Sequence, residues 1–120
     1  MNFFVKKYKI LGCLNRLRMM NILLKYPDGL YVCEIADILE VKQYNISKHL
    51  NLMKMVELVN EEKQGKLVLY KPYYSKENHD LFASILTTAR YNKDVFESDV
   101  KRINKIVKLS GQKECFKNKC

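Results

Sequence analysis

The sequence contains few residues that interrupt helices, with 2 prolines and 4 glycines among 120 residues and no tryptophan. It also lacks an apolar run near the roughly 18 residues that a membrane span requires. Acidic residues are outnumbered, with 13 Asp and Glu against 22 Lys and Arg, so the net charge is +9. The scarcity of Pro and Gly predicts long helices. The positive charge favours a polyanionic partner.

A secretory signal is also absent from the N-terminus. Phe3, Phe4 and Val5 are followed by three lysines instead of a long apolar segment, so we expect a cytoplasmic protein. In that reducing compartment, cysteines are expected to act as free thiols, metal ligands or redox sensors. No CxxC pair occurs among them, which argues against a zinc ribbon: they are Cys13, Cys33, Cys115 and Cys120.

Residues that carry catalysis are scarce. His49 and His79 are 30 residues apart, and neither a glycine-rich phosphate loop nor a cluster of paired carboxylates occurs. We therefore expect no enzymatic activity.

The spacing of apolar residues predicts four helices before residue 57. They cover about residues 3–11, a segment capped by Asn15 that ends before Pro27, residues 32–39, and a segment through Ile46, Leu50 and Met53. The last two are joined by residues 40–42, with the apolar Val41 in the joint. This arrangement is typical of a helix-turn-helix motif.

Residues 58–74 change to a strand pattern. Leu58–Asn60 and Leu67–Tyr70 are joined by a polar run that contains Gly65, which predicts a β-hairpin. Ser75 can cap a following helix whose apolar residues continue to Gly111. A helix of about 35 residues would be roughly 50 Å long, too long for one small domain to cover, so it predicts a homodimer. The alternative is two shorter helices, broken near residues 91–93 and packed internally.

Positive charge coincides with the helix-turn-helix. Residues 41–56 contain three basic and no acidic side chains, and residues 1–26 contain six basic and no acidic ones. The second helix of such a motif enters a major groove beside phosphates. The charge distribution therefore favours DNA binding, and the alternative is a solvated basic face.

Five segments together resemble the ArsR/SmtB family of winged-helix repressors, in the family's order and at nearly its spacing. They are Asn15–Met20, Tyr31–Ala36, Val41–Met53, Leu58–Val59 and Gly65–Tyr70. The resemblance covers about residues 9–90. It implies a mostly α fold with a small β-hairpin, a winged helix-turn-helix, in a homodimer with a long C-terminal helix. It also implies a repressor that binds an inverted-repeat DNA operator and releases it when an inducer binds.

Candidate DNA contacts follow from the helix-turn-helix pattern. If Ile46 and Leu50 face the core, the other side of their helix offers amides, hydroxyls and a cation to bases and phosphates. These residues are Gln43, Tyr44, Asn45, Ser47 and Lys48. At the hairpin tip, Lys63, Gln64 and Lys66 would contact the flanking backbone or minor groove, and Arg16 and Lys42 are further candidates for phosphate contacts.

The sequence departs from the family pattern at the end of the recognition helix. Glu57 stands where the family has glycine. Because Glu does not readily adopt the left-handed conformation of glycine, we expect a local difference at this junction.

The inducer is less defined by the sequence. The resemblance implies a cysteine pair for arsenite or lead, but Tyr31 replaces the first cysteine and Cys33 remains. The family's zinc site is absent, because the last helix has no second histidine after His79. Our hypothesis is a thiolate site for As(III) or a similar soft ion, formed within or between protomers by Cys33, Cys115 and Cys120.

Three alternatives remain open at this point. Cys33 is buried and the two last cysteines are incidental; the cysteines sense oxidants or persulfides; or the domain is a winged-helix protein–protein interaction module. No cofactor is required in any of them. We expect residues 1–110 to form one DNA-binding and dimerisation domain, followed by a flexible cysteine-containing tail, 111–120.

Overall fold

The computed structural model describes the backbone of residues 4–110 and the side chains of residues 4–107. This part of the chain forms six helices and a small antiparallel sheet. The elements are α1 (Phe4–Leu11), α2 (Leu14–Lys25), β1 (Leu30–Tyr31), α3 (Val32–Leu39), α4 (Gln43–Met55), β2 (Val59–Gln64), β3 (Leu67–Pro72), α5 (Lys76–Tyr91) and α6 (Lys93–Ser110). The winged helix-turn-helix expected from the sequence is therefore confirmed. No helix of residues 4–110 combines the length and apolar character needed to cross a bilayer.

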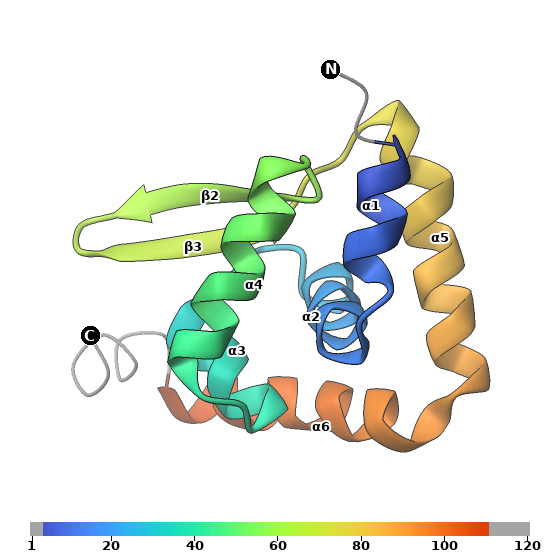
Figure 1. Ribbon diagram of the computed structural model, residues 1–120. Coiled ribbons are helices and arrows are strands. Elements are labelled where there is room, and N and C mark those ends of the chain that lie inside the picture. The colour runs from blue at the N-terminus through green and yellow to red at the C-terminus, as the bar shows by residue number, and fades with distance from the viewer. Residues whose placement is uncertain (1–3, 111–120) are drawn as a thin grey trace.

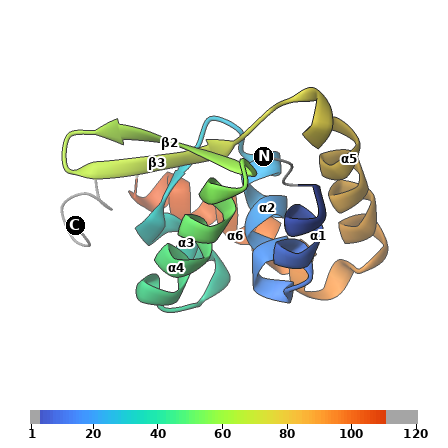
Figure 2. The same ribbon diagram turned by 45° about the horizontal axis from the view of Figure 1, so that its top comes forward.

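The core is built around α2. Met19, Met20, Ile22 and Leu23 of this helix are fully buried. Helices α3 and α6 pack on it from one side and α5 from another, while α1 lies between α4 and α5 (Figures 1 and 2). The hairpin of β2 and β3 projects from this helical body (Figure 1). The helix-turn-helix and the wing thus extend from a shared apolar core.

The sheet has the strand order β1-β3-β2 and is antiparallel throughout. Gln64 pairs with Leu67 across a two-residue turn, and Gly65 at the first turn position has a φ of 65°, which favours glycine. The strands extend further than expected, since the polar residues 61–64 belong to β2 and not to the loop. All of these residues are exposed, because the hairpin projects from the helical body and neither face of this part of β2 is covered.

Helix starts agree with the sequence in one case and differ in another. The Ser75 side chain accepts a hydrogen bond from the Asn78 backbone N–H, as predicted for the cap of α5. The prediction of Asn15 as the cap of α2 is wrong: the cap residue is Cys13, without a side-chain cap bond. The Asn15 side chain instead accepts a hydrogen bond from Arg18 at 3.0 Å.

The single helix expected over residues 75–110 is also wrong, and the alternative of two helices describes the chain. Asn92 is the C-cap residue of α5, where the backbone leaves the helical conformation with φ −121° and ψ 67°, and its side-chain Nδ2 donates to the Thr88 carbonyl. Helix α6 then turns and packs on α2 and α3, so that Phe96 and Ile103 are buried within the chain. The homodimer prediction rested on one helix too long for a single domain to cover, and the structure does not contain that helix.

At the end of α4, Glu57 adopts the left-handed conformation of the family's glycine, with a φ of 61°. Two contacts hold it there. Its carbonyl accepts a hydrogen bond from the buried Asn78 side chain at 2.8 Å, and its carboxylate accepts one from the Tyr73 hydroxyl at 3.2 Å. The backbone expectation for this junction was wrong, because these contacts offset the strain that a side chain suffers there.

Candidate nucleic-acid interface

Helix α4 has one buried apolar side and one side that faces solvent. Ile46, Leu50 and Met53 are fully buried, and this burial turns the opposite face of the helix to solvent. That face carries the residues expected to contact DNA: Gln43, Tyr44, Asn45 and Lys48 are exposed and Ser47 is half-buried. Tyr44 is 72% exposed, a high value for an aromatic side chain. Lys42, the N-cap residue, is exposed beside them.

Two of these residues interact with each other. The Lys48 ammonium lies 5.3 Å from the centroid of the Tyr44 ring, within the range of a cation–π contact. The contact restrains two long side chains one turn apart on the exposed face. It leaves the ammonium charge and the phenol hydroxyl available to a polyanion.

A groove separates α4 from the wing. It has a volume of about 350 Å³ and is lined by Gln43 and Ser47 from α4, Tyr31 and Val32 from the start of α3, and Lys66, Leu67, Val68 and Tyr70 from the wing. The polar side chains of Gln43, Ser47 and Lys66 therefore converge on one concave surface. The structure brings Lys66 of the wing to two residues of α4 that precede it in the sequence by 23 and 19 positions.

The wing presents its predicted contacts at the tip. Lys63, Gln64 and Lys66 are exposed. Gln64 is also held in place, because its side-chain oxygen accepts a hydrogen bond from the Tyr31 hydroxyl and its amide donates to Glu62 at 2.9 Å. This hydrogen bond connects the wing to the first turn of the helix-turn-helix.

The acidic residues Glu61 and Glu62 of β2 are paired with lysines. Lys54 of α4 lies 3.2 Å from the Glu61 carboxylate, and Lys71 lies 3.7 Å from that of Glu62. Glu61 also accepts a hydrogen bond from the Tyr70 hydroxyl, and burial together with the Glu61 charge raises the pKa of that phenol. These pairs reduce the repulsion that two carboxylates would exert on a phosphate backbone.

Arg16 takes a different role from the other candidates. Its Nε donates to Nδ1 of His49 at 3.0 Å and its Nη1 donates to the Ile10 carbonyl at 3.2 Å. Burial lowers the pKa of His49, and the charges of Arg16 and Lys48 lower it further. A neutral imidazole can accept the Arg16 hydrogen bond. Arg16 therefore joins α2 to α4 and is less free for phosphate than its sequence position suggested.

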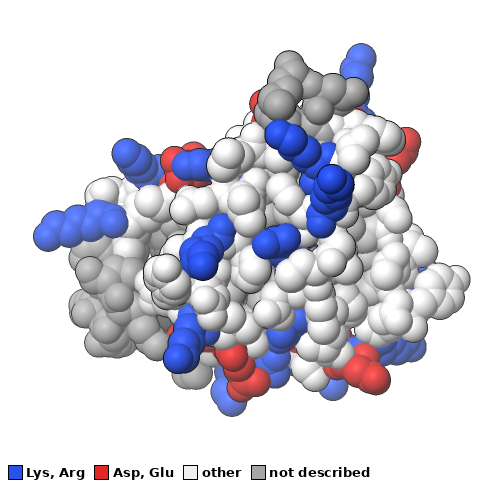
Figure 3. All heavy atoms as spheres, in the orientation of Figure 1, with Lys and Arg blue, Asp and Glu red and all other residues white. Residues whose placement is uncertain are grey.

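Basic side chains do gather on the face that carries α4, but fewer of them are exposed than the number of Lys and Arg residues in the sequence indicated. Figure 3 shows Lys and Arg across the middle of the face that carries α4, with Asp and Glu near its edges. Of the six basic residues before position 27, however, Lys7 and Arg18 form ion pairs inside the protein. Counting charges along the sequence did not distinguish these two from the exposed ones.

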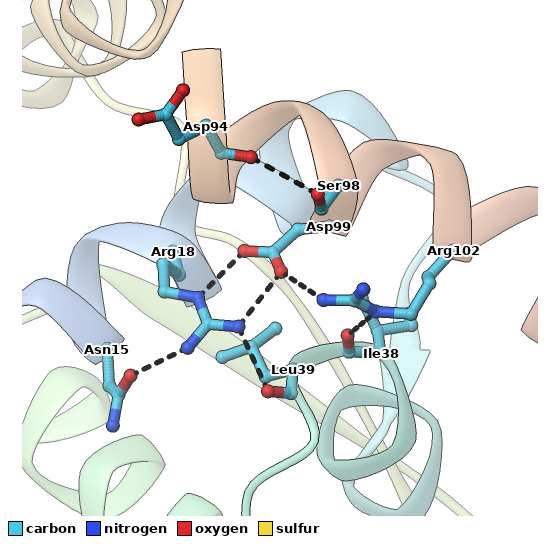
Figure 4. A network of polar contacts seen from close by, with 8 residues as sticks. All are labelled: Asn15, Arg18, Ile38, Leu39, Asp94, Ser98, Asp99 and Arg102. Carbon is cyan, nitrogen blue, oxygen red and sulfur yellow. Dashed lines mark hydrogen bonds and ion pairs between the residues drawn. The ribbon is translucent and has the colours of Figure 1, made fainter. Parts of the chain in front are cut away.

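A buried charge network fastens the helix-turn-helix to α6 (Figure 4). Asp99 of α6 is fully buried, 2.9 Å from Arg18 of α2 and 2.8 Å from Arg102. Arg18 also donates to the Leu39 carbonyl at 2.9 Å, and Arg102 donates to the Ile38 carbonyl. The last two carbonyls of α3 thus receive guanidinium donors. Sequence reasoning missed this cluster, although an Asp within the apolar stripe of α6 was a signal for it.

The predicted thiolate site falls largely outside the described residues. Cys33 is buried, 1% exposed, and packs with Tyr31, Leu67 and Leu69 beneath the wing. Cys13 is a free thiol. Cys115 and Cys120 belong to residues 111–120, which are not described. Within the described residues, no group of three His, Cys, Asp or Glu side chains is placed to hold a metal ion.

A known family covers the helix-turn-helix. Residues 14–61 match the model of the family described as bacterial regulatory protein, arsR family. Over 63 residues the chain is 41% identical to the cadmium resistance transcriptional regulatory protein CadC of Listeria innocua and to that of Lactococcus lactis. The match covers 52% of this chain and 52% of each relative, so the similarity concerns about half of either protein.

Solved structures with the same fold extend the comparison beyond the matched segment. HlyU from Vibrio cholerae N16961, in a structure described as reduced HlyU, superposes with a TM-score of 0.62 at 26% identity. It covers 75% of this chain and 88% of that one. A second HlyU structure has the same score and identity and covers 91% of that chain.

Proposed function

We propose that the chain, whose residues 14–61 match the model of the arsR family of bacterial regulatory proteins, is a homodimeric repressor of that family that binds an inverted-repeat DNA operator. The observation that carries the proposal is the concave surface shared by α4 and the wing, on which Gln43, Ser47 and Lys66 converge. Amide and hydroxyl groups on such a surface read base edges, and the flanking lysines bind phosphates.

Each predicted contact has a distinct expected role. Gln43, Tyr44, Asn45 and Ser47 lie at the exposed start of α4, the part of a recognition helix that contacts bases. Lys42 and Lys48 flank them and would bind phosphates on either side. Lys63, Gln64 and Lys66 would contact the backbone or the minor groove, because the wing projects beyond the helix (Figure 1). Arg16 would contribute mainly by orienting α4 through His49.

Selection from random duplexes with the purified chain tests this function and would yield a preferred sequence. Replacing Lys48 with Ala should weaken binding to all duplexes and lower the slope of log affinity against log salt by about 1. Replacing Gln43 with Ala should reduce the preference for the selected duplex by about 1 to 3 kcal/mol. Lys101→Ala, on the outer side of α6, serves as the control. Equal affinity of the unmodified chain for random and selected duplexes would instead favour a protein–protein interaction module.

Dimerisation is supported by an apolar surface on α1. Phe4, Val5 and Tyr8 of this helix are 52%, 60% and 56% exposed. We propose that a second copy of the chain covers them and places the two α4 helices in successive major grooves. Native mass spectrometry of the Val5→Lys, Tyr8→Lys double variant should show a monomer. Tyr44→Lys, an exposed aromatic residue on the DNA surface, is the matched control and should remain dimeric; a monomeric parent chain would contradict this part of the proposal.

The inducer is proposed to be a soft thiophilic ion, As(III) or Cd(II), bound by Cys33, Cys115 and Cys120. Soft ions select thiolates, and the similarity to regulators named for cadmium resistance supports a metal inducer. Cys33 lies beneath the wing, next to Tyr31 and Leu67 of the groove. A ligand at that sulfur would therefore act close to the DNA surface.

Titration of the reduced protein with arsenite, or with Cd²⁺, tests the metal site. We expect a one-ion adduct in the intact mass, protection of three thiols from alkylation, and release of the selected duplex. Cys33→Ser, Cys115→Ser and Cys120→Ser should each weaken the response, whereas Cys13→Ser should not. Unchanged alkylation of all three cysteines in the presence of metal would refute the site.

A redox inducer is the second candidate, supported by the likeness to a protein described in a reduced form. The two kinds of inducer would change the intact mass of the protein differently. Polysulfide treatment should leave a stable sulfur adduct or a loss of two hydrogens if the cysteines respond to redox chemistry, and release the duplex without any metal.

A further inference from the structure

The outer part of the wing has little support from neighbouring strands. Strand β1 pairs with Leu69 and Tyr70 of β3, so positions 67 and 68, nearer the turn, pair with β2 alone in the described part of the chain. A hairpin of two strands is at best marginally stable in water. This part projects from the helices (Figures 1 and 2). A fixed orientation of the tip therefore depends on side chains that reach it from the helical body.

Tyr31 is a side chain of this kind. It is the last residue of β1 and the N-cap residue of α3. Its backbone is held by pairing with Leu69 and by its N–H, which donates to the Glu34 carboxylate at 3.0 Å. Tyr31 is 7% exposed and packs with Leu67 and Leu69 of β3. The base of the side chain therefore has a defined position on the helical body.

The strand register explains how Tyr31 reaches the tip. Leu67 and Leu69 are two residues apart, so they lie on the same face of β3. Gln64 of β2 pairs with Leu67, and Tyr31 of β1 pairs with Leu69 from the other side. The Tyr31 ring thus crosses β3 on this face, and its hydroxyl donates to Oε1 of Gln64. The amide of Gln64 donates in turn to Glu62 at 2.9 Å.

We infer that Tyr31 is a positioning residue that holds the wing tip in the orientation in which it contacts DNA. The inference rests on the proposed operator function, and it adds a residue that acts on DNA through Gln64. Removal of the hydroxyl leaves the ring packed on β3 but releases the tip from the start of α3. The contacts of the tip with DNA should then weaken, whereas those of α4 should remain.

Hydroxyl-radical footprinting on the duplex selected from random sequences tests this role. The unmodified chain should protect a central segment through α4 and flanking segments through the wing. Tyr31→Phe should keep the central protection, lose the flanking protection and bind about fivefold more weakly, the effect of one hydrogen bond. Tyr74→Phe, which removes a hydroxyl from a ring that is 62% exposed outside the wing, is the matched control and should retain the parental footprint.

Two results would overturn the inference while leaving the proposed function intact. They are flanking protection that persists in Tyr31→Phe, and an equal weakening of central and flanking protection, which would indicate a general loss of structure. A parent chain that selects no duplex would contradict the proposed function instead. Thermal unfolding followed by circular dichroism should show that Tyr31→Phe is folded at the temperature of the assay.

A double-mutant cycle tests the route through Gln64. If Tyr31 acts through this amide, the double variant Tyr31→Phe, Gln64→Ala should bind the selected duplex as weakly as Gln64→Ala alone. Lys48→Ala, on α4, should lower the affinity by the same factor with and without the Tyr31 hydroxyl. Losses that multiply for Tyr31→Phe and Gln64→Ala would show that the two residues act separately, and would refute this route.

Discussion

Asn78 and Asn21 are both buried in this protein, yet their surroundings are opposite. The Asn78 side chain accepts a hydrogen bond from Lys7 at 2.8 Å and donates to the carbonyls of Glu57 and Tyr73 at 2.8 and 2.7 Å. Asn21 has no partner for its side-chain oxygen among the described residues. The buried amide of Asn78 therefore holds α1, α5 and the wing together. The buried oxygen of Asn21, at the corner of α2, α5 and α6, makes no such contact within the described chain.

The difference separates two kinds of region in one small domain. Where the helix-turn-helix meets its supports, buried polar groups are fully paired, as in the cluster of Asp99, Arg18 and Arg102. At the corner, the side-chain oxygen of Asn21 is buried without a partner among the described residues. Paired groups resist change because each removal leaves a partner unsatisfied. Unpaired groups can be replaced with little loss of stability.

The largest expected effect is at Asp99. Replacing Asp99 with Asn removes the counter-charge of two arginines of which Arg18 is itself mostly buried, with a side chain 12% exposed. Loss of one partner of a buried ion pair costs about 3 to 5 kcal/mol. Urea unfolding should therefore show a large decrease in the free energy of unfolding. Asp94→Asn removes the same charge from an exposed position of α6 and should change stability by less than about 1 kcal/mol; equal effects would contradict the assigned role of the cluster.

Asn78→Leu is expected to be next in size. The substitution keeps the shape of the side chain but leaves the Lys7 ammonium and the carbonyls of Glu57 and Tyr73 without this partner. We expect a loss of about 2 to 3 kcal/mol in the free energy of unfolding. Asn104→Leu on the exposed side of α6 is the control. A loss below 1 kcal/mol would mean that water replaces these bonds.

Glu57→Gly should act in the other direction. Glycine relieves the left-handed conformation, with its φ of 61°, and retains the carbonyl to which Asn78 donates. We expect the free energy of unfolding to increase by about 0.5 to 1 kcal/mol. Glu57→Ala loses the same carboxylate but keeps the strain, so it should be less stable than the parent chain. If Ala and Gly had the same stability, strain at this residue would not be the cause.

The smallest expected effect is at Asn21, and it completes the comparison. The substitution Asn21→Leu is chemically the same as Asn78→Leu, but it removes an amide whose oxygen has no partner. We expect stability within about 0.5 kcal/mol of the parent chain, or slightly higher. Thermal unfolding of both leucine variants under one set of conditions measures the contrast. A destabilisation of Asn21→Leu as large as that of Asn78→Leu would remove the distinction between the two regions.

Much of the helix-turn-helix could be predicted from the sequence because its signals are local. The boundaries of α3 at residues 32–39 follow from a short amphipathic stripe, and the exposed side of α4 follows from the spacing of Ile46, Leu50 and Met53. The strand β1 was not predicted, since its two residues are extended through pairing with β3, about 40 positions away.

The C-terminal half was predicted less well, because the helical spacing of its apolar residues continues without interruption across the break between α5 and α6. Ala89 and Phe96 are seven residues apart and both are buried, so the pattern fits one helix as well as two. The helix ends at the C-cap residue Asn92, whose side chain bonds to the Thr88 carbonyl, a polar contact that a hydropathy pattern does not contain. The partners of Arg18 and the isolation of Asn21 depend on how α6 packs, and therefore could not be read before the turn at Asn92 was known.

The arginine bonds at the end of α3 have a mechanical consequence. Arg18 and Arg102 hold the carbonyls of Leu39 and Ile38, the two residues that precede the turn into α4. The turn between α3 and α4 is thus fixed to α6 by hydrogen bonds that depend strongly on geometry. If α6 moved along its axis by about the length of one hydrogen bond, the turn would have to move with it and change the orientation of α4. Otherwise the arginine hydrogen bonds would break.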